Sequence, residues 1–298
     1  MSIVFSVALS IVLPLGFIAS LSFVKFKTKF EWLLDALATF LLVMWIVQSG
    51  PWSWFSHYLR YILLGLLFVA ILFSWRKVRK LPFKMSYTSN QKFSIAVYGF
   101  LILIFGLYNV FILTSYSTND PALALDFPLK EGTYYVGQGG NHVQMNYHQE
   151  YEPQKYALDI LALNSIGTRA KGLYPKELEK YEIYGHPITS PCNGVVVEAE
   201  DGLTDLQPPE TDPENATGNY VALTCESAED TVVYLAHMQE GSVAVEAGMH
   251  VEAGQLLGKV GNTGNTSEPH LHIHAENAGV GVPLIFNDRF LARNHVIR

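Results

Sequence analysis

Three histidines alternate with apolar residues near the end of the chain, at His270, His272 and His274 in the stretch EPHLHIHAEN. On an extended strand, side chains two positions apart point to the same face, so these imidazoles would lie side by side. Such crowding is costly unless something binds there. The spacing therefore indicates a binding site on one face of a short strand.

Two residues elsewhere could contribute to the same site. Asp159 lies inside the apolar run YALDIL, where a carboxylate is costly to bury unless it is paired or bound to a metal. His237 ends the apolar run TVVYLAH, a place where a lone histidine is more often structural than catalytic. Histidines and a carboxylate together are typical of zinc in hydrolases, where three protein ligands leave a fourth position open. Zinc there activates water and polarises a carbonyl, and further histidines can act as base and stabilise the transition state.

The stretch from residue 234 to 277, YLAHMQEGSVAVEAGMHVEAGQLLGKVGNTGNTSEPHLHIHAEN, carries a specific joint pattern. It resembles the C-terminal signature of the lysostaphin-type, or LytM-like, zinc metallopeptidases: Tyr-x-His, a valine and glycine segment, a ladder of glycines, then His-Leu-His. GHPITSPCNGVVVEAED, at 185–201, resembles the hairpin that precedes this signature. A biotinyl- or lipoyl-like carrier domain shares the Val-x-x-Gly-Gln turn, but the chain lacks a carrier-lysine motif.

The resemblance implies a role for each matching position. His272, the second histidine of His-Leu-His, and Asp159 would be zinc ligands. His237 and His270 would be the general base and the transition-state stabiliser, in an order that the sequence leaves open. The family motif does not require a histidine at 274, so we expect His274 to support a ligand or to line the substrate groove.

The first metal ligand departs from the usual family pattern. A histidine normally precedes the aspartate by four residues, but Lys155 occupies that position here. The segment NYHQEYEPQKYALD is similar to family members that read Asn-x-His and then Gln-x-Tyr-Ala-x-Asp. We therefore expect His148 to be the first ligand, with His142 as the alternative.

The first 115 residues have the composition of a membrane region. They carry ten Lys or Arg and two acidic residues, a net charge of +8, whereas residues 116–298 carry −15. The basic residues cluster between long apolar runs, as in membrane proteins and unlike nucleic-acid binders. A bilayer core of about 30 Å needs about 20 apolar residues, and four segments are long enough or nearly so: Ile3–Val24, Trp32–Val47, Tyr58–Trp75 and Phe93–Thr114.

Lysine and arginine in the short loops predict the orientation of this region. The loops at 25–29 and 76–92 are basic, whereas the loop QSGPWSWFSHY between the second and third segments has no Lys or Arg. The basic loops should be cytoplasmic. Both ends of the chain would then face the periplasm or the cell exterior, in an integral, multi-pass protein of the cytoplasmic (inner) membrane.

The remaining residues predict a mostly antiparallel β-sheet domain, because short β-rich runs alternate with Gly, Pro, Asn and Asp from about residue 116 onward. We thus expect two parts, a four-helix transmembrane region at 1–115 and a LytM-like extracytoplasmic domain at 116–298. Cys192 and Cys225 both lie in the second part. Outside the cytosol they could form a disulfide, or they could be two buried thiols.

Together these features predict a membrane-anchored zinc endopeptidase whose substrate lies outside the cytoplasm. Peptidoglycan stem peptides or cross-bridges are the substrates that the family resemblance implies. The alternative is a catalytically inactive LytM-like domain that binds cell wall or regulates a partner hydrolase. A third hypothesis is a membrane receptor or transporter that uses the β-sheet domain as a sensor. The four apolar segments carry no pattern of charges that supports this hypothesis.

Overall fold

The computed structural model describes residues 3–298, which divide into two compact units. The first unit contains the chain up to Trp52 and residues Tyr58–Leu113. The second contains Ser53–His57 and Thr114–Arg298. The short segment Ser53–His57 therefore belongs to the second unit, although it connects two helices of the first.

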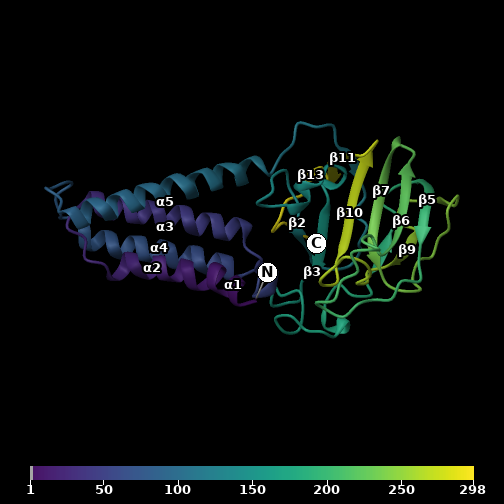
Figure 1. Cartoon of the computed structure of the whole chain (residues 1–298), viewed down its shortest axis with the longest axis horizontal. Helices are drawn as coiled ribbons and strands as arrows, with labels where there is room; N and C mark the ends of the chain where they lie inside the picture. The colour runs from purple at the N-terminus through teal and green to yellow at the C-terminus, as the bar shows by residue number, and fades with distance from the viewer. Residues whose placement is uncertain (1–2) are drawn as a thin grey trace. The chain divides into compact units, whose positions relative to one another are not determined.

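Four helices of the first unit are long and apolar enough to cross a membrane: Ile3–Phe23, Lys29–Ser49, Leu59–Val78 and Ser89–Thr114. The first is continuous through α1 (Ile3–Val7), a π-helical turn (Ala8–Val12) and α2 (Leu13–Phe23), and the others are α3 (Lys29–Ser49), α4 (Leu59–Val78) and α5 (Ser89–Thr114). All four expected segments are thus helices (Figure 1).

The helix α3 is longer than the sequence pattern suggested. It begins with a capping box, in which the Thr28 hydroxyl accepts from the Glu31 amide and the Glu31 carboxylate accepts from the Thr28 amide. These bonds satisfy amides that a helix start leaves unpaired. Asp35 of this helix is fully buried and accepts a hydrogen bond from the Thr39 hydroxyl at 3.2 Å.

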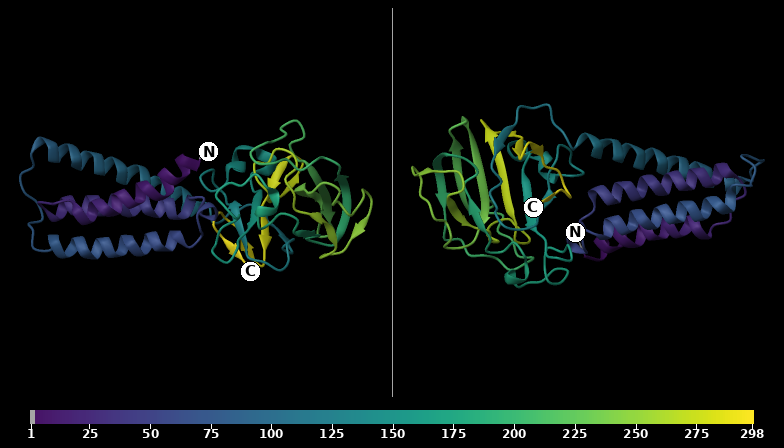
Figure 2. Two further views of the ribbon diagram at one scale, coloured as in Figure 1. Left: turned by 90° about the horizontal axis from the view of Figure 1, so that it is seen from below. Right: turned by 180° about the vertical axis from the view of Figure 1, so that it is seen from behind.

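The second unit is built around a nine-stranded sheet, in the order β14-β2-β3-β10-β7-β6-β5-β8 with β11 paired to β10. All pairs in this sheet are antiparallel, which confirms the expected class; β1 and β12, in a small separate sheet, are parallel. Figures 1 and 2 show the central strands side by side. The strands are β1 (Leu123–Leu125), β2 (Tyr134–Gln138), β3 (Leu158–Ala162), β4 (Pro187–Thr189), β5 (Gly194–Glu200), β6 (Asn219–Cys225), β7 (Ala228–Met238), β8 (His250–Val251), β9 (Leu256–Lys259), β10 (Leu271–Asn277), β11 (Val280–Val282), β12 (Leu284–Phe286), β13 (Arg289–Phe290) and β14 (Val296–Ile297).

The alternation along β10 separates the core from the histidines. Leu271, Ile273 and Ala275 belong to the hydrophobic core cluster of this unit. Because side chains alternate across a strand, the residues between them point to the opposite face. His272 pairs in register with Asp159 of the neighbouring β3, so the sheet itself brings these two side chains together.

A disulfide joins Cys192, just before β5, to Cys225 at the end of β6. It closes a loop with a sequence separation of 33 residues. On a chain-entropy account, a loop of that size stabilises the folded state by about 4 kcal/mol. The bridge resolves the two alternatives that the sequence left open for these cysteines.

Candidate metal centre

Three buried side chains from three different segments meet on the histidine face of the sheet. They are His148 of the 3-10 turn η3 (Tyr147–Glu150), Asp159 of β3 and His272 of β10. The distance to Asp159 Oδ1 is 3.0 Å both from His148 Nε2 and from His272 Nδ1. One potential ligand atom from each of the three lies within 4.8 Å of the other two. Donors at about 2.0–2.2 Å around one tetrahedral ion lie about 3.3 Å apart, so the set fits zinc.

Asn146 explains how His148 reaches this place without the usual four-residue spacing. Its amide nitrogen donates to the carbonyl oxygens of Gly140, Lys155 and Ala157, at 3.2, 3.2 and 3.0 Å. Its amide oxygen accepts from the His148 backbone amide at 3.2 Å. Asn146 is fully buried, and these bonds fold the loop back beside the start of β3. This role of Asn146 was not predicted from the sequence, although the Asn-x-His motif contains the residue.

His142 lies outside the metal-capable groups of the described residues. Its Nδ1 accepts a hydrogen bond from the Gln144 backbone amide at 3.2 Å. Of the two histidines considered for the first ligand, the structure thus brings His148, and not His142, beside Asp159.

Two neighbours orient the ligand atoms. The Tyr147 hydroxyl donates to Asp159 Oδ2 at 3.2 Å, which leaves Oδ1 for the centre of the cluster. His272 Nε2 lies 3.0 Å from His274 Nδ1, and the His274 ring stacks on Tyr234 with an interplanar angle of 7°. If His272 Nδ1 offers its lone pair to a metal, Nε2 carries the proton and His274 accepts it.

His237 and His270 form a second group with His272. Each has its Nδ1 held by a backbone carbonyl: Thr263 at 2.9 Å for His237 and Glu268 at 2.8 Å for His270. Because a carbonyl can only accept, each Nδ1 carries a proton and Nε2 is the nitrogen offered to the site. His237 is the residue before the last one of β7 and has a left-handed backbone conformation, with φ of 63°.

The pKa values of His237 and His270 are shifted in opposite directions. Burial lowers the pKa of His237 well below its usual range, and the neighbouring His270 and His272 lower it further. Burial opposes charge on His270 too, but the Asp159 carboxylate outweighs it and raises the pKa of His270. Asp159 is also buried, yet His148 and His270 hold its pKa well below the usual range. A bound dication would add positive charge beside these groups and lower the pKa of both His237 and His270.

The cluster opens into a cleft of about 370 Å³ that His148, His237, His272 and His274 help to line. The segment around η3 contributes Tyr147, Glu150, Tyr151 and Gln154, and two loops contribute Thr217 and Asn265. The loop at 201–218 thus provides two wall residues, Ala216 and Thr217, whereas none of the cleft residues comes from 161–187.

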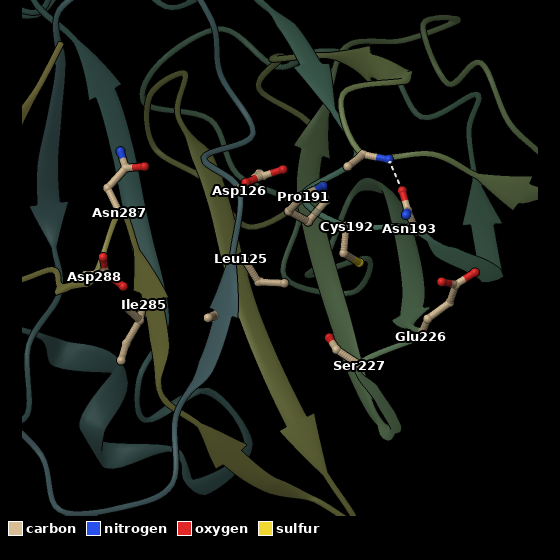
Figure 3. Close-up of a pocket in the computed structure, with 12 residues that line it drawn as sticks. Leu125, Asp126, Pro191, Cys192, Asn193, Glu226, Ser227, Ile285, Asn287 and Asp288 are labelled. Atoms are coloured by element: carbon tan, nitrogen blue, oxygen red, sulfur yellow. Dashed lines mark hydrogen bonds between the residues drawn. The ribbon is translucent and has the colours of Figure 1, made fainter.

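A second hollow of about 610 Å³ shares no lining residue with this cleft. Figure 3 shows its acidic residues, Asp126, Glu226 and Asp288, coming from separate segments. The Asn193 side chain there accepts from the Ala253 backbone amide at 2.8 Å. No histidine lines this hollow. Both groups of described residues that could hold a metal ion contribute histidines to the first cleft instead.

The fold and the histidine cluster agree with a match to a peptidase family. Residues 180–283 match the model of Peptidase family M23. The chain therefore carries a lysostaphin-type, LytM-like domain of this family. The match contains His237, His270 and His272, whereas His148 and Asp159 precede it.

Several solved structures are similar to the chain at low identity. A zinc-containing peptidase from Vibrio cholerae is 18% identical over 55% of this chain and 39% of that chain, with a TM-score of 0.33. A putative peptidase M23 from Pseudomonas aeruginosa is 18% identical over 60% and 56%, also at 0.33. The catalytic domain of the antimicrobial peptidase lysostaphin from Staphylococcus simulans is 24% identical over 36% and 75%, at 0.24. The chain thus spans less than two thirds of the first two relatives.

Proposed function

We propose that the chain is a membrane-anchored zinc endopeptidase that hydrolyses peptide bonds outside the cytoplasm. The observation that carries the proposal is that His148 Nε2 and His272 Nδ1 both lie 3.0 Å from Asp159 Oδ1, in a buried group whose histidines line an open cleft. We assign residues 1–115 to the membrane region and residues 116–298 to the peptidase domain.

In this proposal His148, Asp159 and His272 hold the zinc ion. When bound, zinc supplies Lewis acidity, which makes water a better nucleophile and polarises the scissile carbonyl. His237 and His270 each direct an Nε2 into the site. One accepts the proton of the attacking water and the other stabilises the charge that develops on the carbonyl oxygen. Their Nδ1 bonds to Thr263 and Glu268 fix the ring orientation that both tasks require.

An extracytoplasmic location has two supports. Lysine and arginine are concentrated in the loops after the first and third helices, and the loop between the second and third has none. The disulfide between Cys192 and Cys225 suits an oxidising compartment. Peptidoglycan stem peptides or cross-bridges are the substrate class that the family resemblance favours.

The inactive alternative predicted from sequence requires a missing ligand or a missing catalytic histidine. All five side chains are present in the part of the chain that the structure describes, and none points away from the cluster. We therefore propose catalysis rather than cell-wall binding alone.

The test uses the purified full chain in detergent, with peptidoglycan as substrate and release of new amino termini as readout. We expect about one zinc per chain and hydrolysis that a chelator abolishes and added zinc restores. His272→Ala should lose both zinc and activity, and His142→Ala, the matched histidine outside the cluster, should keep both. Hydrolysis by His272→Ala after rigorous metal removal would refute the proposal.

A further inference from the structure

The segment Ser53–His57 connects α3 to α4 but belongs to the second unit. Three hydrogen bonds attach it to the loop at 166–169. The Ser53 carbonyl accepts from the Arg169 amide at 3.0 Å, and the His57 amide donates to the Gly167 carbonyl at 2.8 Å. The Ser56 hydroxyl donates to the Ile166 carbonyl at 2.7 Å.

Within this segment, Trp54 contacts two side chains at once. Its ring stacks on Tyr174, with centroids 5.5 Å apart and an interplanar angle of 12°. The guanidinium carbon of Arg169 lies 4.2 Å from the centroid of the same ring. Arg169 is only 1% exposed, and its Nη1 has no hydrogen-bond partner among the described residues. The face of Trp54 is thus part of what makes this buried cation tolerable.

Both partners of Trp54 bind the two residues that lead toward β10. The Tyr174 hydroxyl donates to the Ser267 carbonyl at 2.7 Å. Arg169 Nε donates to Glu268 Oε2 at 2.7 Å, and Nη2 of the same guanidinium lies 2.5 Å from that oxygen. Two independent contacts therefore connect one indole ring to two adjacent residues, through the Ser267 carbonyl and the Glu268 carboxylate.

The second of these residues, Glu268, also orients His270 of the cluster. The Glu268 carbonyl accepts from His270 Nδ1 at 2.8 Å, and the Thr266 hydroxyl donates to the same carbonyl at 2.8 Å. On the opposite side of the ring, His270 Nε2 lies 3.5 Å from Asp159 Oδ1. A shift of Ser267 and Glu268 would move the acceptor that holds Nδ1, and with it the direction of Nε2.

We propose that the α3–α4 connection is a positioning element of the hydrolytic site, and that Trp54 holds His270 in its working orientation through Arg169 and Tyr174. The inference rests on the proposed function, because His270 is placed there in the catalytic machinery. It makes turnover depend on a segment whose two ends continue into apolar helices. Any change that draws Ser53–His57 away from residues 166–169 would lower turnover without removing a metal ligand.

The test compares Trp54→Ala with Trp54→Phe, which keeps an aromatic face, and with Phe290→Ala, which removes a half-buried ring of the same unit far in sequence from these contacts. Substituting Arg169 or Glu268 is less informative, since it leaves a buried charge unpaired and threatens folding. Each full-length variant is assayed in detergent for kcat, KM and zinc content on peptidoglycan fragments. The rate at which diethyl pyrocarbonate modifies His270 is measured by peptide mass spectrometry.

A displacement of about 1 Å at a catalytic group can cost about 10²-fold in rate, and we expect a loss of kcat of that order in Trp54→Ala. KM and zinc content should stay near wild type, Trp54→Phe should recover most of kcat, and Phe290→Ala should match wild type. Modification of His270 should become faster only in Trp54→Ala. Unchanged kcat and unchanged modification in Trp54→Ala would overturn the inference, as would equal losses in Phe290→Ala. If the wild type hydrolyses nothing, the proposed function fails, and the modification rates still decide the role of Trp54.

Discussion

His274 provides the sharpest quantitative test of how the ligand set is organised. Its Nδ1 lies 3.0 Å from His272 Nε2, and both rings are buried, at 6% and 4% exposure. Burial, with the neighbouring His272 and His148, lowers the pKa of His274 to about 2, so it stays a neutral acceptor at any working pH. Replacing it with phenylalanine preserves the ring that stacks on Tyr234 but removes the acceptor.

The expected loss can be estimated in two ways. A buried Nε2–H without an acceptor costs about 1–3 kcal/mol. Removal of an outer partner of a metal-binding histidine typically lowers metal affinity by about 10- to 100-fold, which is about 1.4–2.8 kcal/mol. The two ranges agree, so we expect His274→Phe to raise the Kd for zinc by about 10- to 100-fold.

Competition with a chromophoric chelator, on the full chain in detergent, measures this change. His274→Gln, whose side-chain oxygen can accept, should recover part of the affinity. His250→Ala, at an exposed histidine of β8, serves as the control and should bind like wild type. If His274→Phe bound zinc as tightly as wild type, His272 would not be oriented through Nε2 and the assignment of Nδ1 as the ligand atom would be wrong.

Three further predictions follow from the same geometry. Asn146→Ala should destabilise the second unit by about 3 kcal/mol, because several buried carbonyls lose their donor, and urea unfolding would detect it. His148→Ala should abolish stoichiometric zinc binding whereas His142→Ala should not, as measured by metal analysis; equal behaviour of the two would contradict the folded-back loop. Burial lowers the pKa values of His237 and His272 in the folded protein. As the pH falls, these histidines therefore bind protons in the unfolded state before they do so in the folded state, which favours unfolding. The metal-free protein should thus lose about 1.4 kcal/mol per pH unit for each such proton below about pH 6.5. His270, whose pKa is raised, adds stability only as the pH falls toward about 6.5 and offsets nothing below that value. Hydrogen exchange in β7 and β10 at pH 7.5 and 5.5 would show it, and equal protection at both values would count against these shifts.

Much of the fold could be predicted because its signals are local. Apolar runs of bilayer length predicted the four helices, and short β-rich runs divided by turn residues predicted the antiparallel sheet. The start of α3 was missed because a capping box depends on the hydroxyl of Thr28 and the carboxylate of Glu31, which lie outside the apolar pattern. The membership of Ser53–His57 in the second unit was not predictable, since it depends on contacts with residues more than 100 positions away.

In the candidate site too, local sequence patterns predicted some residues, whereas others depend on tertiary contacts. The period-two spacing of His270, His272 and His274 and the apolar setting of Asp159 indicated a shared face, and the register of β3 and β10 supplies it. The place of His148 depends on the folded-back loop that Asn146 ties together, and no local periodicity encodes such a loop. The link from Trp54 to His270 is entirely tertiary and left no motif in the sequence.

The most direct test of the central claim is X-ray absorption at the zinc edge on the full-length protein after reconstitution with one equivalent of zinc. The account predicts two imidazole nitrogens and one carboxylate oxygen at about 2.0–2.2 Å. It also predicts loss of one imidazole in His148→Ala and an unchanged spectrum in His142→Ala. A folded protein that retains no zinc, or a zinc shell that is indifferent to His148, would contradict it.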